Sequence, residues 1–266
     1  MPSRTDFTTS LNALKSLGPP RVWSMLVSIF GDLEQEASTR IDGPLLTKLT
    51  DGMNIKPEAV RVALHRLRND NWINSIKSGR TASHALTSDG LKQRNSAAPL
   101  IYSPVSDLPA KWQIAILQSN DARQKAALDI AGFVPVAPRI YVANDGAQAP
   151  FGVIVSEGKV APDWAQDQVI PSELTAQFST LLTTLNTVKL RLTDADNLTA
   201  LDRALLRCLI VHNWRRLVLR HAYLPPSLVG TTWPGHLCRE QVVALLDVLP
   251  RPTLSELMAE ERPKTS

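Results

Sequence analysis

The sequence predicts a mixed α+β protein of several domains: an N-terminal winged helix-turn-helix, a middle ferredoxin-like domain and a C-terminal helical domain. Three observations lead to this fold class. A helix–turn–helix pattern followed by a hairpin pattern occupies residues 44–87, strand and helix patterns alternate over 112–155, and the pattern is helical from residue 171 onward. A chain of 266 residues is long enough for two or three domains. The expected domains are residues 1–98, 99–168 and 169–266.

The composition is that of a folded protein of the cytoplasm. Hydrophobic residues make up 44% of the chain, as in globular proteins. A run of about 18 apolar residues, which a membrane span requires, is missing, and residues 1–10 lack the apolar core of a secretory signal. The two cysteines, Cys208 and Cys238, indicate a reduced protein and no disulfide framework. We therefore expect a cytoplasmic protein that does not bind membranes.

The positive charge is concentrated in the N-terminal segment. Residues 1–98 carry 13 Lys and Arg against 9 Asp and Glu, a net charge of +4, whereas the remaining 168 residues carry 16 of each sign and are neutral. A local excess of basic side chains favours contact with phosphates through counterion release. The charge distribution therefore points to nucleic acid as a partner of the first domain.

Residues 57–68 predict an amphipathic helix with one apolar and one cationic face. At about 100° per residue, Ala63, Leu64 and Leu67 fall close to Val60, and the basic side chains cover the opposite arc. Pro57 suits the first turn of such a helix. A second helix is expected at 44–50 and a tight turn at 51–54. An alternative is an ordinary surface helix whose arginines face water.

A hairpin pattern after this helix favours the DNA-binding interpretation. Residues 73–86 alternate around a turn at 77–80, and residues 38–41 are expected to add a short strand. Helix, turn and basic hairpin together are typical of a module that places one helix in the DNA major groove. The candidate DNA-contacting residues are Lys56, Arg61, His65, Arg66, Arg68, Lys77 and Arg80.

Further elements complete the expected domains. A core helix at 21–30 ends at Gly31-Asp32, and a polar segment at 90–99 marks a domain boundary. The middle domain should be a ferredoxin-like sandwich. Its expected elements are strands at 112–117, 139–142 and 151–155 and a helix at 121–131. The C-terminal helices are expected at 172–192, 199–221, 236–249 and 254–260.

The long helix at 199–221 carries cations within an apolar stripe. His212, Arg215 and Arg216 lie within about 60° of Leu201 on the helical wheel. A buried guanidinium needs a partner, so we expect an anionic group to meet it. An internal carboxylate would serve, and so would an anionic ligand such as a carboxylate or phosphate. The internal candidates are Asp196, Asp202 and Glu173. Cys208 shares the stripe, but no second pair has ligand spacing, so we expect no metal site.

These features together resemble the PaaX family, the repressors of bacterial phenylacetic-acid degradation. The residues that carry the resemblance are Arg21-Val22-Trp23-Ser24, Ile29-Phe30-Gly31-Asp32, the helix from Val60 to Leu67, Trp72-Ile73, Gly79-Arg80, Gly132-Phe133, His212-Asn213-Trp214-Arg215-Arg216-Leu217-Val218-Leu219-Arg220, Leu224-Pro225 and Trp233-Pro234-Gly235. Residues 79–84 and 221–222 depart from the family pattern, which leaves room for a paralogue that responds to another acyl-CoA.

The resemblance implies a homodimeric repressor that binds an operator in double-stranded DNA. It also implies release from DNA by an aryl-acyl coenzyme A such as phenylacetyl-CoA, and no cofactor. The candidate ligand-binding residues are His212, Arg215, Arg216, Arg220 and Trp233.

Two other functions compete with a ligand-responsive repressor. An acyl-CoA hydrolase-like enzyme would draw on the cluster His212, Arg215, His221, His236 and Cys238, but the chain lacks a Gly-x-Ser-x-Gly elbow, an HExxH helix and a glycine-rich phosphate loop. We therefore expect no enzyme. A DNA-binding adaptor that needs no ligand is the other alternative.

Overall fold

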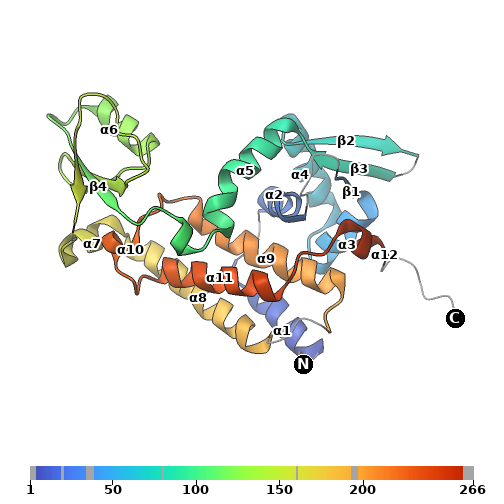
Figure 1. The fold of residues 1–266 in the computed structure, drawn as a ribbon. Coiled ribbons are helices and arrows are strands. Elements are labelled where there is room, and N and C mark those ends of the chain that lie inside the picture. Colours follow the sequence, from blue (N-terminus) through green and yellow to red (C-terminus); the bar gives the residue numbers. More distant parts are fainter. Residues whose placement is uncertain are drawn as a thin grey trace. The chain divides into compact units, whose positions relative to one another are not determined.

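The computed structural model is an α+β protein and describes residues 4–18, 21–33, 39–79, 81–159, 161–192 and 197–259 (Figure 1). Its contacts divide the chain into two compact units. Unit 1 comprises Met1–Ala98, Thr184–Arg215 and Ala244–Ser266, and unit 2 comprises Pro99–Thr183 and Arg216–Val243. Residues of helices α8 (Ser172–Arg191), α9 (Ala200–Val218) and α11 (Pro234–Val248) are therefore shared between the two units.

The apolar helix α2 (Val22–Leu33) lies in the core of unit 1. Met25, Leu26, Ile29 and Phe30 on this helix are fully buried, and α2 packs against α4 (Pro57–Asn69). The expected end of α2 at Gly31-Asp32 is wrong, because the helix continues to Leu33 with Asp32 buried. The other helices of this unit are α1 (Arg4–Lys15), α3 (Gly43–Gly52), α4 (Pro57–Asn69), most of α5 (Ser88–Tyr102) and α12 (Leu254–Ala259).

Helices α3 and α4 follow one another across a short turn. Asp42 begins α3, and its carboxylate accepts a hydrogen bond from the Leu45 backbone N–H at 2.8 Å, which stabilises the first turn. The turn places Asn54 in the left-handed region, at φ 59°, a conformation that Asn tolerates better than most residues. Pro57 then occupies the first turn of α4, as predicted.

A three-stranded antiparallel sheet follows α4 in unit 1. Strands β2 (Ile73–Ser78) and β3 (Thr81–Leu86) form a hairpin, and the short strand β1 (Ile41–Asp42) pairs with the other edge of β3. Gly79 turns the hairpin with a φ of 58°. The hairpin projects beyond the helices of this unit (Figure 1).

A four-stranded antiparallel sheet forms the centre of unit 2, with the order β5-β6-β4-β7. The strands are β4 (Trp112–Ile116), β5 (Val134–Ala137), β6 (Ile140–Asn144) and β7 (Ile154–Gly158). Gly158 faces Trp112 in the register, where a Cβ would lie 2.3 Å from the indole ring. The sheet therefore needs glycine at this position for the tryptophan to pack.

Two strands of this sheet differ from the prediction. Strand β5 was not predicted, because Pro135 lies within it and proline is a poor signal for a strand. The strand tolerates proline because it is at the edge of the sheet. Strand β7 begins at Ile154, later than expected, and Phe151 is fully exposed before it.

Helices and connecting turns complete unit 2. They are the turn η1 (Val105–Asp107), α6 (Ala122–Ile130), α7 (Asp163–Val169) and α10 (Pro226–Val229), together with parts of α8, α9 and α11. The long helix α9 ends at Val218 and not at His221, because the Arg220 N–H bonds to the Leu217 carbonyl in a tighter turn.

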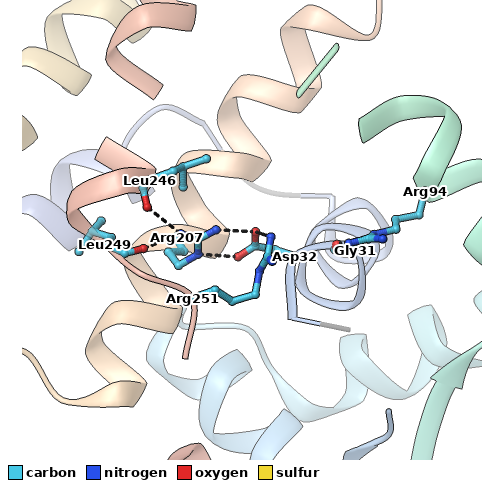
Figure 2. A network of polar contacts seen from close by, with 7 residues as sticks. All are labelled: Gly31, Asp32, Arg94, Arg207, Leu246, Leu249 and Arg251. Atoms are coloured by element: carbon cyan, nitrogen blue, oxygen red, sulfur yellow. Dashed lines mark hydrogen bonds and ion pairs between the residues drawn. The ribbon is translucent and has the colours of Figure 1, made fainter. Parts of the chain in front are cut away.

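A buried ion-pair network joins three segments of unit 1 (Figure 2). The Arg207 guanidinium on α9 donates two hydrogen bonds to the Asp32 carboxylate, at 3.0 and 3.1 Å. Its remaining terminal nitrogen donates to the carbonyls of Leu246 and Leu249 at the end of α11. Arg251 adds a third contact to Asp32 at 3.3 Å. We call Asp32, Arg207 and Arg251 the Asp32 network.

The two arginines keep Asp32 ionised. Burial alone would raise the pKa of this carboxyl, but the charges and hydrogen bonds of Arg207 and Arg251 lower it below its ordinary value of 3.8. The Asp32 carboxylate and the Arg207 guanidinium are both shielded from water, because Asp32 is 0% exposed and Arg207 is 4% exposed. Since neither partner can be rehydrated in place, each depends on the other.

We expect Asp32→Ala to destabilise the protein by about 3–5 kcal/mol, because it leaves the buried guanidinium of Arg207 without its carboxylate. The measurement is the urea unfolding midpoint at constant slope. Glu157→Ala is the control, because it removes a carboxylate whose pair with Lys111 is exposed on both sides, and it should change the midpoint little. Equal losses in the two variants would contradict the importance of the Asp32 network.

The contribution of Asp32 should also depend on pH. Its pKa is lowered in the folded state, so its stabilisation is complete above the unfolded pKa and is lost as the pH falls through the folded pKa. The difference in unfolding free energy between the wild type and Asp32→Asn should therefore be constant at neutral pH and narrow below about pH 4. Urea titrations from pH 7 to pH 3 measure this difference. A difference that widens in acid would contradict a lowered pKa of Asp32 in the folded protein.

Candidate functional site

Helix α4 buries one face and exposes a basic one. Val60, Ala63, Leu64 and Leu67 are buried, and the helix packs against α2, α3 and β2. The predicted helix and its apolar face are therefore confirmed. The basic side chains on the rest of its surface are all exposed: Arg61, His65, Arg66 and Arg68.

The arginines of this basic face make only weak contacts with nearby carboxylates. Arg61 lies 4.0 Å from Glu58, and Arg66 lies 3.5 Å from Asp70, with all four side chains exposed. Arg66 also lies over the ring of Trp23 on α2, 5.1 Å from its centroid. Exposed ion pairs of this kind contribute little to stability, so a phosphate or a base edge can replace the carboxylates at small cost.

The turn before α4 and the hairpin after it carry the other predicted DNA-contacting residues. Lys56 is exposed at the N-cap of α4. Lys77 is exposed near the end of β2, opposite Ala82 of β3. Arg80 lies outside the described residues. Six of the seven predicted positions therefore lie on the surface of unit 1, in or next to α4 and β2.

Polar contacts fix the hairpin against its neighbours. Arg40, which the sequence analysis did not single out, donates to the Ser83 hydroxyl and carbonyl and to Asn74 Oδ1, each at 2.9 Å. These contacts join the segment before β1 to both strands of the hairpin. Arg68 of α4 donates to the Ser75 hydroxyl at 3.5 Å. The hairpin and α4 therefore form one surface.

A buried histidine lies beneath this surface. His84 Nδ1 is 2.8 Å from the Ser75 hydroxyl, and its ring meets the edge of Phe30 at 6.4 Å. Burial, and then the positive charges of Arg68 and Arg40, lower the pKa of His84. The imidazole is therefore neutral at physiological pH, and His84 contributes packing to the hairpin and no charge.

Two of the predicted ligand-binding residues contact α2 in unit 1. His212 is buried, with Nδ1 3.3 Å from the Ser28 hydroxyl. Arg215 donates to the Ser28 hydroxyl at 3.3 Å, to the Ser24 hydroxyl at 3.2 Å and to the Ser24 carbonyl at 3.4 Å. Neutral oxygens of Ser24 and Ser28 are therefore among the partners of these two side chains.

The carboxylates considered as internal partners are placed elsewhere. Asp202 pairs with Arg4 at 2.6 Å, and Glu173 accepts a hydrogen bond from Gln177 at 3.3 Å. Asp196 lies outside the described residues. A buried carboxylate does pair with an arginine of α9, but the pair is Asp32 with Arg207.

The other predicted ligand-binding residues belong to unit 2. Arg216 is half-buried, and burial together with the charge of Arg220 lowers its pKa. Arg220 is exposed. Trp233 lines a pocket of about 590 Å³ with Ile170 and Val229. His212 and Arg215 on α9 therefore both contact α2 in unit 1. Arg216, Arg220 and Trp233 belong to unit 2.

Trp233 belongs to an aromatic cluster in unit 2. Its ring meets Phe178 at 5.1 Å and His236 at 5.0 Å, both edge-on. The cluster depends on Gly235, because a Cβ there would lie 2.2 Å from the indole. Arg239 is buried nearby, where it donates to the carbonyls of Leu100 and Ser103, and burial lowers its pKa to about 10. This tryptophan therefore has a structural role as well as a place in the pocket.

Two residues of the competing enzyme hypothesis, His236 and Cys238, contact separate backbone carbonyls. The His236 Nε2 atom lies 2.9 Å from the Leu224 carbonyl. The Cys238 thiol donates to the Phe178 carbonyl, and burial raises its pKa to about 12. Burial also raises the pKa of Cys208 well above its ordinary value. Neither thiol is therefore an activated nucleophile.

Among the residues that the structure describes, no group of three or more His, Cys, Asp and Glu side chains is placed to hold a metal ion. Among the helices of those same residues, none is long and apolar enough to cross a membrane.

Comparison with known proteins gives two family matches and one curated relative. Residues 21–90 match the family described as PaaX-like protein, and residues 171–253 match the PaaX-like protein C-terminal domain. The chain is 26% identical over 244 residues to the transcriptional repressor PaaX of Escherichia coli strain K12, and the match covers 82% of this chain and 77% of the relative. The first family segment contains α2, α3, α4 and the hairpin.

Proposed function

Because the chain belongs to the PaaX-like protein family, we propose that it is a transcriptional repressor that binds operator DNA through α4 and the β2–β3 hairpin. The family is one of transcriptional repressors and not of enzymes. The observation that carries the proposal is the exposed basic face of α4 on a helix whose opposite face is buried.

In this proposal α3, α4 and the hairpin act as a winged helix-turn-helix. Helix α4 enters the major groove, where Arg61 and Arg66 are the side chains suited to read guanine through two hydrogen bonds. Lys56, Lys77 and Arg80 contact the phosphate backbone and fix the register. His65 and Arg68 lie on the same exposed side of the helix and contribute base or phosphate contacts.

We further propose a homodimer that acts in the cytoplasm and reads two operator half-sites, as helix-turn-helix repressors do. The three-domain division is part of this proposal. For the middle domain, the strand order β7-β4-β6-β5 of unit 2 supports a ferredoxin-like arrangement. Residues 145–153 between β6 and β7 contain no helix, so the arrangement would lack the second helix of that fold.

The proposed effector is an aryl-acyl coenzyme A such as phenylacetyl-CoA. Its phosphates need cations, and Arg216 and Arg220 supply two of them close together in sequence. Burial and the charge of Arg220 disfavour the charged form of Arg216, so an anion placed there would be stabilised. The further candidate ligand-binding residues are Trp233 in unit 2 and His212 and Arg215 in unit 1. Binding weakens operator affinity only if the effector prefers the state that does not bind DNA.

We expect Arg61→Ala and Arg66→Ala each to weaken operator binding by about 1–3 kcal/mol if the side chain reads a base. Fluorescence anisotropy with an operator duplex and a scrambled duplex measures the loss and its specificity. Arg123→Ala on α6 is the control, because it removes an exposed arginine in unit 2. Operator affinity unchanged in both α4 variants would show that α4 does not read DNA.

Thermal shift with acyl-CoA thioesters tests the effector. At a concentration about 100 times its Kd, a ligand of the folded state should add about 2.7 kcal/mol of stability. Phenylacetyl-CoA should raise the melting temperature where coenzyme A does not, and Arg216→Ala with Arg220→Ala should reduce the rise, whereas Arg191→Ala should not. A rise with another thioester would change the pathway and keep the repressor. No rise with any thioester would contradict a ligand-responsive repressor and favour the adaptor.

A further inference from the structure

Unit 1 contains a cavity of about 250 Å³ that touches the turn between α3 and α4. Four segments line it: the end of α1, the start of α2, the α3–α4 turn and the middle of α9. The lining residues are Leu14, Lys15, Gly18, Met25, Met53, Asn54, Leu209, His212 and Asn213.

Four apolar side chains line this cavity beside the buried polar side chains of His212 and Asn213 and the cation of Lys15. Leu14, Met25, Met53 and Leu209 are almost fully buried, and the flexible side chain of Met adapts to ligands of irregular shape. Lys15 is half-buried, and its ammonium donates to the Gly52 carbonyl at 3.3 Å. The cavity therefore offers an apolar body and one cation to a bound molecule.

The buried polar side chains of α9 hold the walls in place. The Asn213 amide donates to the carbonyls of Leu14 and Leu209, each at 3.0 Å, which joins α9 to α1. His212 approaches Ser28 of α2. A molecule in the cavity would consequently lie between segments that are fixed relative to one another, as preformed binding sites require.

The cavity also borders the turn that precedes α4, so a ligand in it would contact that turn. Met53 ends α3, and Asn54 is the turn residue with positive φ. The end of α3 is in close contact with α9, since a Cβ at Gly52 would lie 2.8 Å from the Leu205 methyl groups. A ligand between α9 and Met53 therefore contacts the turn that sets the direction of α4.

We infer that this cavity binds a small amphipathic anion, with one ring or a short acyl chain among Met25, Met53 and Leu209 and the anionic or carbonyl end at Lys15. A cavity of about 150 Å³ suffices for benzene, and drug-sized ligands take about 300 Å³ or more. The cavity thus accepts one ring and excludes a coenzyme A group. Free aryl carboxylates and the acyl end of their thioesters share this chemistry.

The effect of such a ligand on DNA rests on the proposed function, but its binding does not. The sequence contains four methionines, Met1, Met25, Met53 and Met258, of which two line the cavity. Met258 lies on α12 and is 45% exposed. Methionine labelled with carbon-13 at the methyl group therefore reports on the cavity directly by NMR of the full chain, with Met258 as an internal control.

The probes are phenylacetate, phenethylamine, phenylacetyl-CoA and coenzyme A. Phenylacetate should shift the Met25 and Met53 signals and leave Met258 in place, whereas phenethylamine, of similar shape and opposite charge, should not. Lys15→Gln should weaken phenylacetate binding about tenfold, because it removes a charge-assisted contact. Lys125→Gln on α6 is the matched control and should have no effect. Leu209→Phe should fill the cavity and abolish the shifts; Lys15→Gln provides the test if that variant does not fold.

The outcomes of this experiment test the cavity site and the proposed repressor function separately. Shifts of Met25 and Met53 with phenylacetyl-CoA alone would support the site and assign it to the thioester. A melting-temperature rise with phenylacetyl-CoA in which neither methionine signal moves would overturn the cavity site and keep the proposed effector. If neither the Met25 nor the Met53 signal shifts with any probe at millimolar concentration, the inference is overturned, whatever the operator-binding result. Shifts without a change in operator affinity would support the site and contradict its coupling to α4.

Discussion

The buried carboxylate of Asp32 joins three segments of unit 1. Asp32 lies on α2, the helix against which α4 packs, and its charge is balanced inside the protein by Arg207 and Arg251. Burial favours protonation of Asp32, and only the guanidiniums reverse that preference. The helix that supports α4 is therefore held through Asp32 by an arginine that lies 175 positions from it in the chain.

The sequence was most informative where structure is set locally. The apolar period of α4 predicts which side is buried, because four residues on one helix are enough to define it. The Asp32 network has no such signal. The sequence predicts a helix end at Gly31-Asp32 and does not single out Arg207, because its partners on α2 and at the end of α11 lie far away in the chain. Helical periodicity predicts the face on which a residue lies and not the group that it meets.

The candidate ligand residues show the same limit. His212 and Arg215 share a stripe on α9 with Arg216, yet the first two contact serines of α2 and the third belongs to unit 2. A buried cation can also contact neutral oxygens, and serine oxygens of α2 are among the partners of Arg215. A half-buried guanidinium has five N–H donors, and hydroxyl and carbonyl oxygens of a neighbouring helix can accept from them.

Helix α9 contacts three other helices of unit 1 and links the features described above. Within unit 1 it contacts α2 through Arg207 and Arg215, α1 through Asn213, and the end of α3 through Leu205. Each contact is either a buried polar interaction or a close packing contact, and neither kind tolerates a gradual displacement. A displacement of α9 would therefore disturb its contacts to α1, α2 and α3 together. A helix with this pattern of contacts is suited to transmit ligand binding to α4 as a change between two discrete arrangements.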